Sequence, residues 1–235
     1  MKLTPDQTIF WKYGFVTINL TLVTTWGLML LMVIGARLIT RKLKSNIKLS
    51  HWQCVLEMIV AFIKDQIVEA GLASPENYMG FIGTLFLFIG MSNLLIILPW
   101  YTPPTSSLST TAALALSVFL AVPFYGIRKS GFFTYLKTYI EPTFIMLPFN
   151  IIGQLSRTLA LAVRLFGNIM SGVTIVGILL SITPLFIPIL MKALGLLTGM
   201  VQAYIFGILA TVYIAAAVKE GAKKRKKLKL QKSTT

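Results

Sequence analysis

The sequence contains few cysteine, histidine and acidic residues, and each scarcity excludes a class of chemistry. Cys54 is the one cysteine in 235 residues, which excludes an internal disulfide and a multi-cysteine metal site. The one histidine, His51, leaves little for a metal site or a histidine proton relay. The chain has only seven Asp and Glu residues against 22 Lys and Arg residues, so its net charge is +15. We therefore predict a chain with no bound metal and no cofactor.

Charged residues of either sign are also scarce, at 12% of the chain, while 56% of the residues are hydrophobic. A soluble domain is about one quarter charged, so this composition indicates a polytopic membrane protein. The basic residues gather in short segments between apolar runs and at the C-terminus. That placement is the positive-inside pattern and not the groove-lining stripe of a nucleic-acid-binding protein.

The apolar runs predict an all-α fold and a single membrane domain over residues 1–235. We expect five transmembrane crossings, one interfacial amphipathic helix and a long, strongly tilted C-terminal helical hairpin. A helix over the fourth apolar run would measure roughly 50 Å, whereas the hydrocarbon core is about 30 Å thick. The expected segments are span one at 13–36, the interfacial helix at 50–71, span two at 79–98, span three at 112–127, a long tilted helix at 143–181, a last tilted helix at 189–218 and a basic cytoplasmic tail at 219–235.

The basic segments also predict the orientation of the chain in the membrane. Residues 37–48 contain five cations and no anion, and the tail after residue 218 is strongly basic, so both should lie in the cytoplasm. The loops at 99–111 and 181–188 carry no charge and should lie outside. We therefore expect a multi-pass protein with the N-terminus outside and the C-terminus cytoplasmic. The membrane we assign it to is a bacterial plasma (inner) membrane.

Arg164 lies near the middle of the fourth apolar run. A charge at that depth costs at least a few kcal/mol, so it is a functional-site candidate by default. All seven acids lie at segment ends or on the amphipathic helix. Because a buried unpaired charge is strongly unfavourable, we expect another subunit to provide the counter-charge. Gln202 should lie at a similar depth in the last helix, where its amide oxygen could accept from Arg164.

Other polar residues extend the candidate site along the same helix. Arg157 lies two turns before Arg164 and is either an interfacial anchor that snorkels to the headgroups or part of the mechanism. Asn168, Ser171 and Thr174 form a polar stripe that fits helix packing and an aqueous path equally well. Further candidates for lining such a path are Asn93, Asn150, Gln154 and Ser156.

Two other functions are alternatives to an ion path. An intramembrane enzyme needs a Ser–His dyad or an aspartate pair within the bilayer, and the predicted spans contain no His or Asp. A structural membrane anchor of a larger complex, without its own ion path, stays open as the alternative. That alternative predicts that loss of Arg164 disturbs assembly and leaves ion flux intact.

Three motifs resemble subunit a of the F-type ATP synthases. They are Arg164-Leu-Phe-Gly-Asn168 on the long helix, Gln202-Ala-Tyr-Ile-Phe206 on the last helix and Pro104-Thr-Ser-Ser-Leu-Ser-Thr-Thr111 before a span. The similarity extends from Trp52 to Val218. Three motifs in order on the expected topology are far more specific than one five-residue match.

The resemblance implies a non-catalytic, ion-translocating stator subunit beside a rotating ring of c subunits. Arg164 would be the family's essential arginine, Gln202 the glutamine that faces it and Asn168 the asparagine of the motif. Two offset half-channels would lead ions to and from the ring carboxylates, coupling ion flow to ATP synthesis or hydrolysis. The implied partners are the c-ring, the peripheral-stalk b subunits, the catalytic head indirectly, and the lipid bilayer.

The chain departs from the family pattern at positions where relatives often carry titratable residues. Val173 and Gly153 stand where many relatives have a glutamate, Gly195 where some have a histidine, and Ser107 where an aspartate is expected. A path without titratable side chains conducts protons through water but suits a hydrated cation at least as well. We therefore hypothesise a divergent branch in which the transported ion is H⁺ or Na⁺.

Overall fold

The computed structural model describes residues 9–13, 16–41, 51–98, 101–140, 146–182 and 187–233. Helices dominate the described part, and a short hairpin precedes them. In chain order the elements are β1 (Ile9–Tyr13), β2 (Val16–Asn19), α1 (Leu20–Thr40), α2 (His51–Glu69), α3 (Glu76–Leu94), the 3₁₀ helices η2 (Leu95–Ile97) and η3 (Pro104–Ser106), α4 (Leu108–Ser130), α5 (Phe132–Ile140), α6 (Met146–Ile182) and α7 (Ile187–Ser233).

Five helical segments are long and apolar enough to cross a membrane. These are Leu20–Leu38, Glu76–Ile97, Leu108–Ser130, Pro148–Ser181 and Ile189–Lys223. The predicted all-α, polytopic class with five crossings is therefore confirmed. The expected amphipathic helix is present as α2, and its position at the membrane interface stays a prediction.

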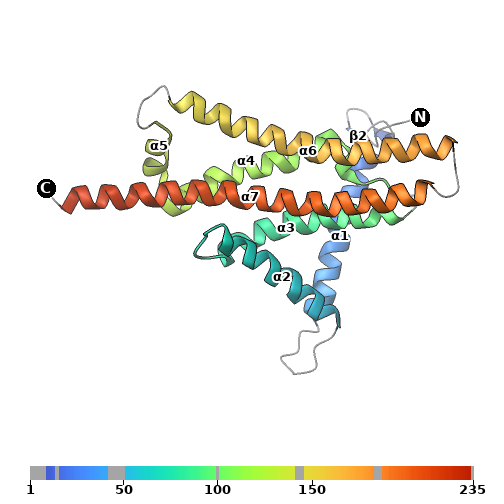
Figure 1. Cartoon of the computed structure of the whole chain (residues 1–235), viewed down its shortest axis with the longest axis horizontal. Coiled ribbons are helices and arrows are strands. Elements are labelled where there is room, and N and C mark those ends of the chain that lie inside the picture. Colours follow the sequence, from blue (N-terminus) through green and yellow to red (C-terminus); the bar gives the residue numbers. More distant parts are fainter. Residues whose placement is uncertain are drawn as a thin grey trace.

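The two longest helices, α6 and α7, lie side by side and run antiparallel, and α3 and α4 extend along them (Figure 1). Helix α1 stands across their direction (Figure 1). With 37 residues α6 is about 55 Å long, and with 21 residues α1 is about 31 Å long. Helix α1 therefore matches the thickness of the hydrocarbon core when it stands upright, whereas α6 is far too long to do so.

Helix α7 is the centre of the packing, because α3, α4 and α6 all contact it. Its side chains Phe206 and Ile214 are fully buried in the bundle. Leu161 and Leu165 of α6 are buried as well, at 2% and 0% exposure. These two leucines fix which face of α6 points into the bundle, and so also which side chains of α6 point away from it.

The element boundaries differ from the expected ones at both ends of the chain. Span one was expected from residue 13, but β1 and β2 pair there as an antiparallel hairpin and α1 begins at Leu20. Consecutive β-branched residues at 16–18 favour a strand. The last helix was expected to end at residue 218, but α7 extends to Ser233. Lys, Leu and Gln are good helix formers, and cations near a helix C-terminus complement its dipole.

Helix α5 was not expected at all. It is nine residues long and follows α4 directly, after Gly131. Gly131 has φ = 89°, which favours glycine because other residues rarely adopt that conformation. Residues 14–15, 50, 143–145 and 234–235 of the predicted segments lie outside the described ranges.

Candidate functional site

Arg164 lies on α6 with its side chain exposed. Its neighbours Leu161 and Leu165 are buried against the rest of the bundle, whereas Val163 is 61% exposed. Within the ranges that the structure describes, no carboxylate pairs with Arg164 and no hydrogen bond satisfies its guanidinium. Asp6 and Glu141 lie outside those ranges. The guanidinium is therefore presented on the outer surface of a membrane-spanning helix.

Two amide side chains join neighbouring helices to one turn of α7. Asn168 of α6 donates from Nδ2 to the carbonyl oxygen of Thr198, at 3.3 Å. Asn93 of α3 donates from Nδ2 to the next carbonyl oxygen, that of Gly199, at 2.8 Å. Asn93 is completely buried. These bonds fix α7 between α3 and α6 at the depth of Gln202, which begins the next turn.

Gln202 is 4% exposed, and its Nε2 has no hydrogen-bond partner among the described residues. Arg164 and Gln202 lie on adjacent, antiparallel helices. No hydrogen bond joins them in the described part of the chain. That Gln202 faces Arg164 in function therefore stays a prediction.

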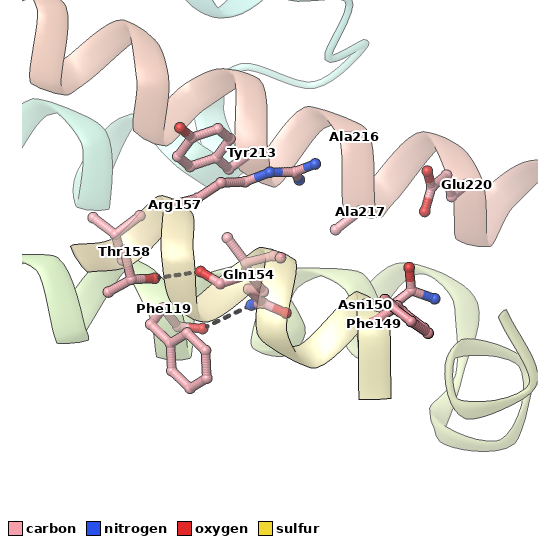
Figure 2. Close-up of a pocket in the computed structure, with 13 residues that line it drawn as sticks. Phe119, Phe149, Asn150, Gln154, Arg157, Thr158, Tyr213, Ala216, Ala217 and Glu220 are labelled. Carbon is pink, nitrogen blue, oxygen red and sulfur yellow. Dashed lines mark hydrogen bonds between the residues drawn. The ribbon is translucent and has the colours of Figure 1, made fainter. Parts of the chain in front are cut away.

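A cavity of about 210 Å³ lies between α4, α6 and α7; we call it the Arg157 cavity. Its polar lining is drawn in Figure 2 and consists of Asn150, Gln154, Arg157, Thr158, Tyr213 and Glu220. The guanidinium carbon of Arg157 lies 5.8 Å from the centre of the Tyr213 ring, within cation–π range. Glu220 lies further along the same helix as Tyr213 (Figure 2). A cation in this cavity would meet charges of both signs and several amides.

A second cavity, of about 270 Å³, lies between α6 and α7 near the turn that joins them; we call it the Lys192 cavity. Residues of the loop before η3 close one side of it. Its polar lining consists of Tyr101, Thr102, Asn168, Lys192 and Thr198. Burial raises the pKa of the Tyr101 phenol above its ordinary value, so the phenol stays protonated at neutral pH.

Arg164 lies between the two cavities along α6. The α6 residues that line the Arg157 cavity fall within 149–158, and those that line the Lys192 cavity fall within 168–180. Arg164 lines neither. The site thus consists of a polar cavity and a mostly apolar cavity with a few polar residues, both beside α6, with an unpaired guanidinium between them.

Some of the predicted lining residues line one of the two cavities, and the others line neither. Asn150, Gln154 and Arg157 line one cavity and Asn168 lines the other. Ser171 and Thr174 bond back to carbonyl oxygens of α6 and line neither cavity. The remaining two candidates, Ser156 and Asn93, line neither cavity: Ser156 is exposed, and Asn93 is buried between α3 and α7.

Sequence reasoning missed Lys192, Tyr213 and Glu220 as parts of the site. Lys192 could have been found, because it is a cation inside a long apolar run, the signal that identified Arg164. Tyr213 and Glu220 give no such signal, because only the packing of α7 against α4 and α6 brings them to the cavity. Among the described residues no group of three potential metal ligands occurs.

Fold and site together define an integral membrane subunit that presents a charged residue on the outside of its longest helical hairpin. The family model described as ATP synthase A chain matches residues 22–215. The chain belongs to this family, the membrane component of the ATP synthases and not their catalytic head. It is therefore a protein of ATP synthesis and ion transport.

The chain is similar over most of its length to proteins named as ATP synthase subunit a. It is 63% identical to one from Albidiferax ferrireducens over 219 residues, which cover 93% of this chain and 95% of the relative. It is 63% identical to subunit a 1 of Chlorobaculum parvum, covering 93% and 97%. It is 56% identical to subunit a of Nitrosospira multiformis, covering 94% and 88%.

Proposed function

We propose that this chain is the stator of the membrane sector and guides ions to and from the carboxylates of a rotating c-ring. The observation that carries the proposal is the exposed, unpaired guanidinium of Arg164 between two separate cavities, one polar and one mostly apolar with Lys192, Tyr101 and Asn168 in its lining. A charge on the surface of a membrane helix needs a partner. A ring carboxylate at mid-membrane is such a partner, and each turn of the ring brings further carboxylates past Arg164.

The two cavities are the proposed half-channels. If residues 37–48 and the tail after residue 218 are cytoplasmic, the start of α6 is near the cytoplasm. The Arg157 cavity then opens inward and the Lys192 cavity outward. An ion cannot pass directly between them, because the fixed positive charge of Arg164 repels it. It must cross on the ring instead, so that ion flow turns the ring.

The helix lengths support a steep inclination of α6 and α7 in the membrane. Helix α1 has the length of an upright span and stands across the other two (Figure 1). With α1 upright, α6 and α7 lie strongly tilted. A tilted α6 holds its two cavities at different depths and at different positions along the ring, which is what two offset half-channels require.

Arg164 performs the exchange by electrostatics. Its guanidinium stays protonated at every physiological pH, so it favours the ionised form of the ring carboxylate and displaces the bound ion. Each ion that crosses the full potential delivers about 2.3 kcal/mol per 100 mV. We propose that this energy drives ATP synthesis in the attached catalytic head, and that hydrolysis in the head drives the reverse flow. Peripheral-stalk b subunits would hold the chain against rotation.

The direct test of this function is ion transport by an assembled complex in which Arg164 is replaced. A chain that only anchors the complex would leave transport unchanged.

The cavity linings bear on the identity of the ion. Gly153 lines the Arg157 cavity, and Val173 and Gly195 line the Lys192 cavity. These are three of the positions where the resemblance led us to expect titratable residues. Both cavities therefore lack a proton-accepting side chain at those positions, and Glu220 is the one carboxylate among the described residues that line them. We propose that a hydrated cation, Na⁺ as well as H⁺, uses this path.

Sodium should protect the ring carboxylate from modification. In the purified complex, rising sodium concentration at fixed pH should slow the loss of ATP hydrolysis caused by a carbodiimide, because a bound sodium ion occupies the carboxylate. Potassium at the same ionic strength is the control. Equal inactivation rates in both salts would exclude sodium coupling and leave the proton as the ion.

A further inference from the structure

Two buried amides, Asn93 of α3 and Gln202 of α7, each have one polar atom without a partner among the described residues. Asn93 is 0% exposed, and its Oδ1 accepts no hydrogen bond from any described residue. Gln202 is 4% exposed, and its Nε2 donates none within the same ranges. One unpartnered atom is an acceptor and the other is a donor. The two groups are therefore chemically complementary.

Helix geometry brings the two amides over the same turn of α7. Asn93 Nδ2 bonds to the Gly199 carbonyl oxygen, and a Cβ atom at Gly199 would lie only 2.8 Å from Asn93 Cγ. Asn93 thus fills the space that a side chain at residue 199 would occupy. Gln202 is three residues later, and a helical side chain leans back toward the helix N-terminus over that preceding turn. This spacing leads us to expect both amides at one buried region.

A buried polar atom without a partner is strongly disfavoured, and internal water is the usual remedy in a polar region. One water molecule can accept from Gln202 Nε2 and donate to Asn93 Oδ1. Such a water would satisfy both atoms at once. The hydrogen bond to Gly199 fixes the Asn93 amide, so the position of such a water is fixed as well.

We propose that Asn93 is a positioning residue for Gln202 and acts through one internal water that the two amides share. This inference rests on the proposed role of Gln202 opposite Arg164. With Nε2 of Gln202 held by the water, the orientation of the carboxamide is set. Its oxygen is then the atom left to accept from the Arg164 guanidinium. Helix α3, which carries no charge near this depth, thereby takes part in ion exchange.

A matched pair of substitutions separates hydrogen bonding from packing. Asn93→Ser keeps a hydroxyl and leaves room for another water, whereas Asn93→Ala has nearly the same size and no polar atom. ATP-driven ion pumping is measured in inverted membrane vesicles and divided by the amount of assembled complex. We expect Asn93→Ser to retain most of the pumping and Asn93→Ala to lose most of it. Equal rates for the two variants would overturn the proposal, since a packing role predicts equality.

A double-mutant cycle tests whether the two amides act together. Gln202→Met removes the amide at similar volume, and it is combined with Asn93→Ala. Groups that share a water are coupled, so the double variant should pump within about threefold of the slower single variant. Independent groups would instead multiply their losses, and that result would overturn the shared water.

Failure of this inference is distinguishable from failure of the proposed function. If Arg164→Ala abolishes pumping but the losses of Asn93→Ala and Gln202→Met multiply, only the shared water is wrong. If Arg164→Ala pumps normally, the proposed ion path itself is wrong.

Discussion

Replacing Arg164 with alanine should reduce coupled ion transport to background while the complex still assembles. The side chain is exposed and makes no hydrogen bond, ion pair or ring contact with the described residues. Its loss therefore should not unfold α6, whose buried face is formed by other residues such as Leu161 and Leu165. What is lost is the fixed charge that displaces ions from the ring and keeps the two cavities from communicating.

The measurement is ATP-driven pumping and passive ion conduction in vesicles, together with the amount of complex recovered after mild solubilisation. Arg164→Lys is the matched control, because it keeps the charge but loses the planar guanidinium. We expect it to assemble fully and to transport more than Arg164→Ala and less than the unaltered protein. If Arg164→Ala instead lowers the amount of complex recovered while the complex that does assemble transports ions at the normal rate, the chain is a purely structural anchor.

A bulky side chain in either cavity should stop passive ion conduction through the membrane sector. Gly153 lines the Arg157 cavity and Gly172 lines the Lys192 cavity. At both positions an added Cβ meets no atom within 4 Å, so a larger side chain enters open space. Gly153→Phe and Gly172→Phe should each reduce passive ion conduction through the membrane sector to background, because both cavities are needed in series.

Gly27→Phe is the matched control for these two variants. Gly27 belongs to a membrane-spanning helix, α1, and an added Cβ there also meets nothing within 4 Å, but it lines neither cavity. Conduction should therefore be unchanged in Gly27→Phe. Normal conduction in either Gly153→Phe or Gly172→Phe, with the complex assembled, would show that the corresponding cavity is not a half-channel.

Much of the fold was predictable because a bilayer constrains a sequence strongly. The apolar runs alone identified the five crossing segments, since each must satisfy its backbone polar groups within a helix. The excess length of the fourth run predicted the long α6. Arg164 was predictable for the same reason, because a charge inside such a run is rare and expensive.

The remaining features depend on tertiary packing, or on a local choice between strand and helix that the hydrophobic pattern does not decide. Nothing in the pattern around Tyr213 or Glu220 indicates that α7 brings them to the same cavity as Arg157. Asn93 was predicted to line an aqueous path, but its bond to Gly199, 106 residues away, could not be inferred. The hairpin of β1 and β2 was missed because its second strand, β2, belongs to the same apolar run as α1.

The central claim, that the Arg164 face of α6 lies against a ring of carboxylate-bearing helices, is tested most directly by cross-linking. Gly167 is exposed, lies on the turn after Arg164 and has open space around it. In a Cys54→Ser background, Gly167→Cys is combined with a cysteine in the ring subunit, placed one helical turn from its carboxylate. The assembled complex is then oxidised. The control is Gly27→Cys on α1, combined with the same ring cysteine. We predict a disulfide between this chain and the ring subunit for Gly167→Cys and none for Gly27→Cys. A cross-link from Gly27→Cys with none from Gly167→Cys would contradict the account.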